Sequence, residues 1–352
     1  MNLVSDHVQN TTMASTASTL DKDCLVTNEA LYRVYAAVTI IIFILALPLN
    51  ASVLHLFIFK LKFWKTNSNN IFLFNMVLAD ILLLFCLPFK AHNFLSGERR
   101  SVQDATCKAM LFMMFLNRGA SIAFLTVISI DRYFNVVWPG RKNFLKALKK
   151  SPHISIIIWL LLLPLTIPTM LNTFECCNSH KAVDGEDKNK KIAFVKDVVD
   201  SLREIVFFTQ IVIPFVILLY CTVCIVNRLR KKTVGDKTKL RRASFLVSSV
   251  MVVFSICFLP CALARMVLLI ARVQGWSEDT ENIAAEAFDG LMVLSYFDCL
   301  LDPLVYCFCS TKFKGLYLSS YFPCLVKGGQ VPEDSLNSAA HSSNPKRINS
   351  VI

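Results

Sequence analysis

The sequence predicts an all-α membrane protein, a seven-helix transmembrane bundle followed by a short amphipathic helix on the membrane surface. Composition is the first indication: of the 352 residues, 55% are hydrophobic and only 18% are charged, against roughly 25% charged in soluble domains. Second, the apolar residues gather in seven separate segments, each near the length of about 20 residues that spans a bilayer. Third, lysine and arginine are concentrated in alternate connections between these segments. A soluble enzyme and a disordered chain are excluded by this pattern.

The apolar segments are bounded by the positions at which charged and polar residues begin. They cover residues 34–59, 70–93, 107–137, 153–172, 203–228, 242–272 and 283–309. We therefore expect an extracellular tail over 1–33, a transmembrane domain over 34–309, an amphipathic helix over 310–324 and a disordered cytoplasmic tail over 325–352. Proline occurs in six of the seven segments, which membrane helices tolerate because neighbouring groups satisfy the freed carbonyls. The third segment lacks proline, so we expect it to form the long straight helix.

The orientation follows from the basic residues in the short loops. The loop after the third segment carries five lysines and arginines within 141–150 and no acid. The loop after the fifth segment carries eight basic residues against Asp236 alone. Because basic loops stay in the cytoplasm, the N-terminus is predicted to be outside and the C-terminus inside. The net charge of +12 is thus a topology signal, and we expect no nucleic-acid partner.

Four of the 13 cysteines, Cys24, Cys107, Cys176 and Cys177, lie on the predicted extracellular side. Four cysteines allow three pairings. A bridge from Cys107, at the start of the third segment, to Cys176 or Cys177 would hold the intervening loop over the mouth of the bundle. The other loop cysteine could then hold Cys24 and tie down the N-terminal tail. The sequence leaves open which of the adjacent cysteines takes which partner.

Two modification sites are predicted in the flanking regions. Asn10 begins an Asn-Thr-Thr glycosylation sequon in the extracellular tail. Cys324 follows the predicted surface helix, a position that favours palmitoylation.

Ionisable residues inside the apolar segments cost several kcal/mol on insertion scales, so each is a functional hypothesis. Seven of them are the candidates: Asp80, Arg118, Asp131, Arg132, Arg265, Asp298 and Asp302. Arg118 and Arg132 are 14 residues apart, which places them on one helix face about 21 Å apart. The Arg118 guanidinium matches a ligand carboxylate, although a structural ion pair with one of the three aspartates is the alternative. Arg265 could contact ligand or extend to the membrane interface.

Family motifs occur in order, each on its own segment. They are Asn50, Leu78-Ala79-Asp80, Cys107, Asp131-Arg132-Tyr133, Trp159, Pro214, Phe254, Cys257-Phe258-Leu259-Pro260 and Asp302-Pro303 with Tyr306. Together they resemble the class A (rhodopsin-like) G-protein-coupled receptors over residues 30–325. The run from Asn117 to Thr126, together with Arg265, is similar to the hydroxycarboxylic acid, oxoeicosanoid and hydroxyeicosatetraenoic acid receptors.

The resemblance implies a plasma-membrane receptor, not an enzyme, that binds a small anionic ligand, a hydroxycarboxylic acid or an oxidised fatty acid. It implies signalling through Gi/o proteins to lower cAMP, with arrestin and receptor kinases acting on the serine-rich tail and with membrane lipid as surroundings. The implied ligand-binding residues are Arg118, Arg265, Asn117 and Tyr296. The implied G-protein-coupling residues are Asp131, Arg132 and Tyr133, and the implied activation relay is Phe254, Phe258, Pro260, Asp302, Pro303 and Tyr306.

The resemblance also implies an allosteric sodium ion and no other metal or cofactor. The implied sodium site comprises Asp80, Asn117, Ser121, Asp298 and Asp302. The alternative for this cluster is a water-filled hydrogen-bond network without an ion.

The sequence departs from the common class A pattern at a few positions. Phe258 stands where most members have a tryptophan, and Asp302 where they have an asparagine. Thr222 replaces a tyrosine of the fifth helix, and Tyr220, two residues earlier, is expected to face elsewhere. The outer half of the third segment has no aspartate, which argues against an amine ligand.

Other functions are weighed against this hypothesis. A class A receptor for a peptide or a nucleotide is the first alternative. A transporter is more distant, because the two halves show no internal repeat. A membrane enzyme is not expected, because the chain lacks HExxH and GxSxG motifs and a His/Cys metal set.

Overall fold

The computed structural model describes residues 28–61, 68–96, 104–138, 151–167, 174–176, 181–182, 190–231, 237–309 and 311–321. The chain divides into two compact units, Met1–Cys309 and Ser310–Ile352, which are described separately. Apart from one small sheet and connecting turns, the described residues are helical.

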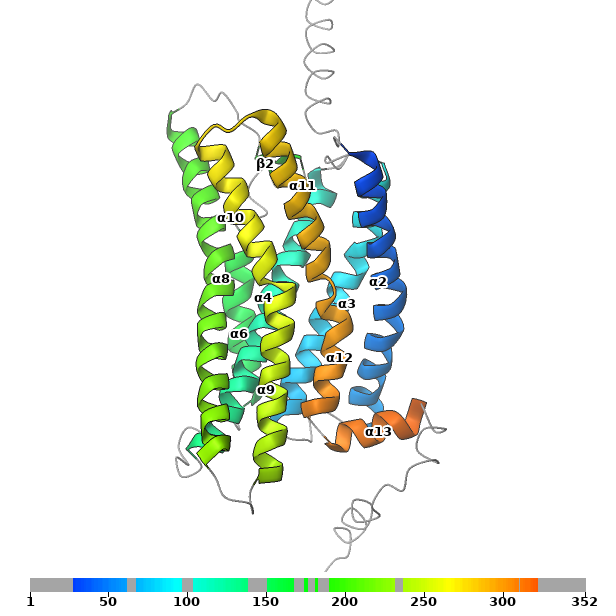
Figure 1. Ribbon diagram of the computed structural model, residues 1–352. Helices are drawn as coiled ribbons and strands as arrows, with labels where there is room; N and C mark the ends of the chain where they lie inside the picture. The colour runs from blue at the N-terminus through cyan, green and yellow to red at the C-terminus, as the bar shows by residue number, and fades with distance from the viewer. Residues whose placement is uncertain are drawn as a thin grey trace, which may run out of the picture. The chain divides into compact units, whose positions relative to one another are not determined.

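The first unit contains nearly all of the described secondary structure (Figure 1). Its helices are α2 (Glu29–His55), η1 (Leu56–Lys60), α3 (Ser68–Leu95), α4 (Asp104–Val137), α6 (Ser151–Thr166), α8 (Lys190–Lys231), α9 (Lys237–Cys257), α10 (Leu259–Val273), α11 (Glu278–Ser295) and α12 (Asp298–Cys309). Between α6 and α8, strands β1 (Phe174–Cys176) and β2 (Lys181–Ala182) pair antiparallel. Below, the end of the bundle at which α2 begins is called the outer end.

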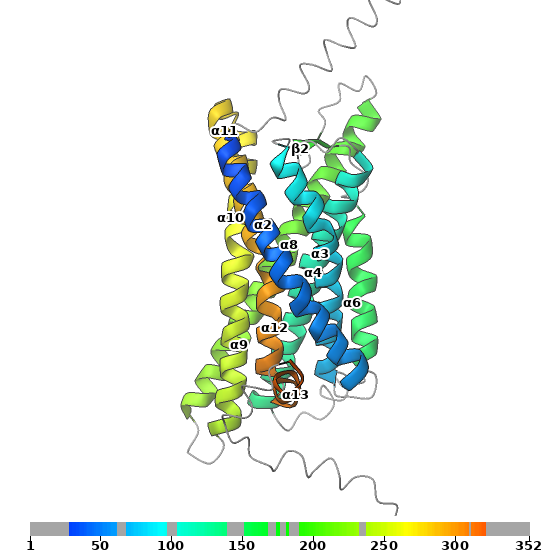
Figure 2. The ribbon, with the colours of Figure 1, turned by 90° about the vertical axis from the view of Figure 1, so that its right-hand side faces the viewer.

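The helices of this unit lie side by side as a bundle (Figures 1 and 2). Helix α2 packs on α3, α3 on α4, α4 on α8, and α10 on α11. Helix α4 is the central one. In its most apolar stretch of 18 residues, 78% of the residues are buried, against 22% in α8 and 28% in α2. It runs without interruption from Asp104 to Val137, as expected for the segment that lacks proline.

Apolar side chains also cover the outside of the bundle. Leu160 on α6 and Val216 on α8 are among many exposed large hydrophobic residues, an arrangement that suits lipid surroundings. Within the described residues, five helical stretches are long and apolar enough to cross a membrane. Helix α6 is apolar but shorter, and the last segment is divided into α11 and α12. The predicted class, an all-helical seven-transmembrane bundle, is confirmed.

Three predicted segments differ from the observed helices in detail. Helix α8 begins at Lys190 instead of 203, because an amphipathic stretch continues the helix beyond the part that hydropathy marks. The sixth segment is two helices, with a break at Phe258, since Pro260 has no N–H to donate to the preceding turn. The seventh segment breaks at Tyr296 and Phe297, whose N–H groups bond three residues back to Val293 and Leu294.

The second unit contains α13 (Thr311–Tyr321). Phe313, Tyr317 and Tyr321 follow one another at four-residue intervals, so their rings share a helix face. Their ring centroids are 5.9 Å and 5.3 Å apart in sequence order. An aromatic stripe therefore runs along one face of α13.

Candidate functional site

Arg118 lies at a point where four helices meet. Its side chain is only 5% exposed. On one side Nη2 lies 2.7 Å from Sδ of Met292 on α11 and 4.0 Å from Sγ of Cys261 on α10. On the other side the guanidinium carbon lies 5.1 Å from the ring centroid of Phe207 on α8 and 5.9 Å from that of Phe115 on α4. The guanidinium is therefore surrounded by sulfur atoms and aromatic rings.

Among the side chains that the structure describes, no carboxylate lies within ion-pair distance of Arg118. Asp298 interacts with it electrostatically at longer range. The alternative ion pair with Asp80, Asp298 or Asp302 is thus not formed in this structure. Because a buried charge is costly unless it is paired, this position suits an anion supplied from outside the protein.

Arg265 on α10 has a protein partner. It is 2% exposed, and its Nε donates to Oε2 of Glu204 on α8 at 3.0 Å while Nη2 donates to Oε1 at 2.5 Å. Its guanidinium carbon also lies 5.3 Å from the ring centroid of Phe288. Of the two alternatives for Arg265, extension to the membrane interface is not the one observed, because this carboxylate holds the side chain inside the bundle.

Glu204 was missed by the sequence analysis. It lies within the predicted fifth segment, so the signal was present: an acid in an apolar stretch requires a partner. Its Oε1 also accepts from Arg203, at 3.2 Å from Nε and 2.9 Å from Nη2. Arg203 in turn pairs with Asp200 at 3.1 Å. A run of alternating charges therefore links the outer part of α8 to α10.

The two arginines of the site lie at neighbouring levels of the bundle. Cys261, beside Arg118, precedes Arg265 by four residues on α10. Likewise, Met292, which contacts Arg118, follows Phe288 by four residues on α11. The ring of Phe288 faces the guanidinium of Arg265. One α-helical turn rises about 5.4 Å, so Arg265 lies about one turn closer to the outer end than Arg118.

Asn117 and Tyr296 were the other two candidates for ligand contact. Nδ2 of Asn117 donates to Oδ1 of Asp80 at 3.2 Å, so this amide faces the polar core beneath the arginines. Tyr296 is buried, its hydroxyl lies 3.7 Å from Sδ of Met114, and it interacts electrostatically with Arg118. Of the two, only Tyr296 is oriented toward the surroundings of Arg118.

Three buried carboxylates meet in the middle of the bundle. Oxygens of Asp80, Asp298 and Asp302 all lie within 4.8 Å of one another. Within the described part of the chain, no hydrogen bond of standard geometry reaches either oxygen of Asp298 or Asp302. Ser121 is buried close to Asp298, and Asp298 begins α12, where the helix dipole favours a negative charge.

This cluster fits a small cation. Three like charges in a low-dielectric interior repel one another unless protons or a cation balance them. Oxygen ligands are those that hard cations prefer. The structure thus brings together all five residues of the predicted sodium site, including Asn117 through its bond to Asp80.

The aromatic part of the predicted relay forms a stack. Rings of Phe215 on α8 and Phe254 on α9 lie 5.9 Å apart, and those of Phe254 and Phe258 lie 5.3 Å apart. Pro260 is the second residue of α10, just beyond this stack, and Pro303 lies inside α12. The side chain of Tyr306 is outside the described residues.

At the other end of α4, Asp131 is buried and Arg132 and Tyr133 are partly buried. The hydroxyl of Tyr133 lies 3.4 Å from that of Tyr220 on α8. Tyr220 is 58% exposed, so its ring lies on the outside of the bundle, where it contacts Tyr133.

Cys107 at the outer end of α4 is disulfide-bonded. Its partner is not among the free cysteines of the described residues, which are Cys86, Cys221, Cys224, Cys257, Cys261 and Cys299. The side chains of Cys24, Cys176 and Cys177 lie outside the described residues, so the pairing stays a prediction. Asn10 and Cys324 also lie outside them.

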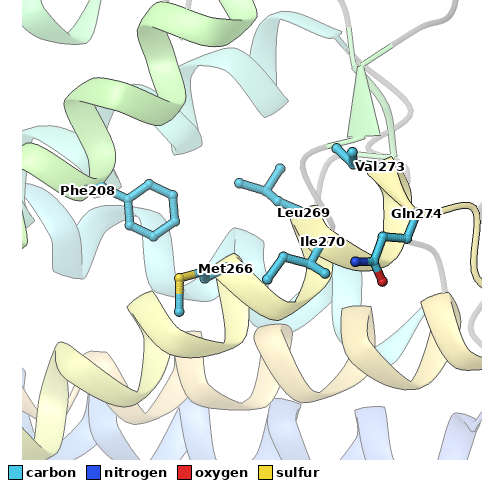
Figure 3. Close-up of a pocket in the computed structure, with 6 residues that line it drawn as sticks. All are labelled: Phe208, Met266, Leu269, Ile270, Val273 and Gln274. Carbon is cyan, nitrogen blue, oxygen red and sulfur yellow. The ribbon is translucent and has the colours of Figure 1, made fainter.

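A groove of about 310 Å³ lies between Phe208 of α8 and the outer half of α10 (Figure 3). The α10 residues that line it are Met266, Leu269, Ile270, Val273 and Gln274. Met266 is 44% exposed and Val273 87% exposed, so the groove opens on the outside of the bundle. It is a separate feature from the buried arginines.

Comparison with known proteins gives consistent relatives. A family model described as "7 transmembrane receptor (rhodopsin family)" matches residues 49–306. The chain is 31% identical over 291 residues to mouse hydroxycarboxylic acid receptor 1, covering 82% of this chain and 80% of that protein. It is 33% identical over 278 residues to the mouse 12-(S)-hydroxy-5,8,10,14-eicosatetraenoic acid receptor, covering 77% and 83%. Human oxoeicosanoid receptor 1 is 28% identical over 295 residues, covering 82% and 73%.

Proposed function

This chain belongs to the rhodopsin family of seven-transmembrane receptors, and from that premise we propose that it binds a small carboxylate ligand at Arg118. The ligand class is a hydroxycarboxylic acid or an oxidised fatty acid, the chemistry that the names of its relatives specify. The receptor acts at the plasma membrane and signals through Gi/o proteins. Members of this family are multi-pass receptors that couple to heterotrimeric G proteins and are not enzymes.

The observation that carries the proposal is the environment of Arg118. Its guanidinium is buried and has no carboxylate partner among the described side chains. A guanidinium presents two parallel donors to a carboxylate. The rings of Phe115 and Phe207 exclude water from this pair, which strengthens its electrostatic attraction.

Arg118 is also well placed to couple ligand binding to the helix breaks. It contacts Cys261, three residues beyond the break at Phe258, and Met292, four residues before the break at Tyr296. A carboxylate that draws Arg118 toward itself changes its contacts with α10 and α11 together. In this proposal the ligand shifts an equilibrium between two packings of the bundle, and the stack of Phe254 and Phe258 transmits the shift toward α9.

On the cytoplasmic side, Asp131, Arg132 and Tyr133 are the proposed G-protein contacts. They lie in the last two turns of α4, which ends at Val137. The same central helix also carries Arg118. The cationic loops predicted beside them suit an acidic surface on the partner.

Sodium is the proposed allosteric ion. Asp80, Asp298 and Asp302 would supply carboxylate oxygens, with Ser121 and Asn117 beside them. A bound cation there would balance the repulsion among the three carboxylates and stabilise the packing of α12 against α3 and α4.

The proposal is tested by replacing Arg118. Arg118→Ala should reach the cell surface and lose 30-fold to several thousandfold in potency for acidic agonists, since a lost partner of a buried charge costs about 2–5 kcal/mol. Arg118→Lys should restore little, because an ammonium lacks the planar fork. Dose–response curves in a cAMP assay, over carboxylates of rising chain length and their methyl esters, give the measurement.

Arg33→Ala is the matched control, because Arg33 pairs with Glu29 on the exposed surface of α2. It should leave potency within about twofold, as exposed ion pairs contribute little. A normal response of Arg118→Ala, or an ester as potent as its acid, would contradict the proposal. So would a nucleotide or peptide that outperforms every carboxylate.

A further inference from the structure

We propose that Glu204 is an internal competitor for ligand: it occupies Arg265 in the unliganded receptor, and the ligand carboxylate displaces it. Arg265 then forms the outer of two anion subsites, with Arg118 as the inner one. The inference rests on the proposed function, because it takes the ligand to be a carboxylate. It adds a specificity-determining residue on α8 that neither the family motifs nor the ligand chemistry specifies.

The first support is that Glu204 already binds Arg265 as a ligand carboxylate would. Both of its oxygens accept from the guanidinium, at 3.0 Å from Nε and 2.5 Å from Nη2. This two-point geometry is the one that arginine offers to any carboxylate. A ligand acid therefore finds the same donors, and it has to compete with Glu204 for them.

The second support is that Glu204 keeps a partner when it releases Arg265. Arg203 donates to its Oε1 from Nε and from Nη2, at 3.2 Å and 2.9 Å. A buried charge that loses every partner is costly, but this carboxylate exchanges one guanidinium and retains the other. The displacement is thus an exchange of ion pairs and does not leave Glu204 unpaired.

The third support is the position of Arg265 relative to Arg118. Arg265 lies about one helical turn closer to the outer end, on the same side of α10 as Cys261, which touches Arg118. Both guanidiniums interact electrostatically with this cysteine. A carboxylate that arrives from the outer end therefore meets Arg265 before it reaches Arg118.

The fourth support concerns the seam between α8 and α10. Helix α10 packs mainly on α11 and only slightly on α8, and beside the ion pair the apolar groove at Phe208 and Leu269 leaves the seam partly unfilled (Figure 3). The ion pair of Glu204 with Arg265 thus links α8 to α10 where the two helices are loosely packed. Its exchange for a ligand would release α10 from α8, which joins ligand selection to helix movement.

The test uses the purified full-length receptor with octanoate as the carboxylate and octanamide as its neutral analogue. Ligand-dependent thermal stabilisation is measured for wild type, Glu204→Gln and Arg203→Gln. Glu204→Gln removes the competing charge, so half-maximal stabilisation should need about tenfold less octanoate, the worth of one charge-assisted contact. Arg203→Gln leaves Glu204 with Arg265 alone, so about tenfold more octanoate should be needed. Octanamide should show neither shift.

Glu29→Gln is the matched control, because it removes the same charge at the outer end of the bundle but from an exposed pair with Arg33. It should shift the octanoate dependence by less than about twofold. Adding Arg265→Gln to Glu204→Gln should abolish the gain. If Glu204→Gln does not fold, the opposite shift in Arg203→Gln still decides the question.

Equal octanoate dependence in wild type and Glu204→Gln, or no octanoate stabilisation of Glu204→Gln, would overturn the inference. So would an unchanged dependence in Arg203→Gln. These failures are distinct from failure of the Arg118 proposal. Octanoate stabilisation that is lost in Arg118→Ala but unaffected by Glu204→Gln overturns only the role of Glu204. Stabilisation that survives Arg118→Ala yet shifts with Glu204→Gln overturns only the role of Arg118.

Discussion

Three aspartates, Asp80, Asp298 and Asp302, concentrate negative charge in the buried interior of the bundle. A single such carboxylate is costly in a low-dielectric environment, and three together also repel one another. Asp80 has Asn117 as a donor, while Asp298 and Asp302 lack hydrogen bonds of standard geometry in the described part of the chain. The pair on α12 is therefore the part of the cluster on which a cation would have the largest effect.

We predict that sodium stabilises the purified receptor and that Asp298→Asn removes most of this effect. An ion that binds only the folded state stabilises it by about 2.7 kcal/mol at a concentration of 100 times its dissociation constant, which raises the Tm by several degrees. The Asn side chain keeps the shape but lacks the charge. Melting curves in sodium chloride and in choline chloride at equal ionic strength provide the measurement.

Asp289→Asn is the control for this prediction. Asp289 is also buried, but it lies on α11 and accepts from the hydroxyl of Tyr32 at 2.6 Å, away from the three-aspartate cluster. The variant should be less stable than wild type in both salts and should keep the sodium-dependent gain. The same gain in Asp298→Asn as in wild type would contradict the sodium site.

At the scale of helices, α2 and α11 approach so closely that a glycine is required between them. A Cβ added to Gly290 would lie 2.5 Å from the hydroxyl oxygen of Tyr35 and 2.7 Å from its Cζ. That hydroxyl donates to the backbone carbonyl of Glu286, one turn earlier on α11, at 3.2 Å. The tyrosine ring is thus fixed against α11, and it has little freedom to move away from a larger residue.

We predict that Gly290→Ala destabilises the receptor, by about 1–3 kcal/mol for an overpacked contact. The intrinsic helix preference of alanine over glycine, about 1 kcal/mol, acts in the opposite direction and is outweighed. Thermal melting and cell-surface amount are the measurements. Adding Tyr35→Ala should recover part of the loss by making room.

Gly315→Ala is the matched control, because nothing lies within 4 Å of a Cβ added there. This substitution should be neutral or slightly stabilising, as alanine favours the helix. If Gly290→Ala is as stable as Gly315→Ala, the close approach of α2 and α11 does not exist in solution.

At the scale of the whole molecule, one uninterrupted helix connects the proposed ligand site to the proposed G-protein contacts. Helix α4 carries Arg118 and also Asp131, Arg132 and Tyr133, and it is the most buried of the long helices. Helices α9, α10, α11 and α12 around it are divided by breaks. The central helix is thus continuous, whereas its neighbours have breaks at which they can bend. This arrangement suits transmission of a signal across the bundle.

We predict that an acidic agonist lowers forskolin-raised cAMP in cells that express this receptor and that pertussis toxin abolishes the effect. The reason is the cationic cytoplasmic rim predicted from the loops, together with the Gi/o coupling that the family resemblance implies. Arg132→Ala, at the proposed contact, should remove the response while retaining agonist binding. A toxin-insensitive rise in cAMP on agonist addition would contradict Gi/o coupling.

The sequence by itself determined the seven segments and the receptor class, and it identified Arg118 and the three aspartates as functional candidates. These conclusions are accessible because partition into a bilayer is a property of each segment separately. A charge within such a segment stands out whatever the packing. The missing N–H of Pro260 is also a local property, but the helix break that accompanies it, at Phe258, became visible only in the structure.

Only the tertiary structure decided which charges meet. Within the described residues, Arg118 lies among Met292, Cys261 and two phenylalanines and has no carboxylate beside it. Arg265 instead pairs with Glu204, a residue that the sequence analysis overlooked. Both arginines occupy apolar segments, and the sequence pattern does not show which of them meets a carboxylate. The difference arises from how α8 and α10 are rotated and packed, which depends on side-chain shape across several helices at once and is not a property of any one segment.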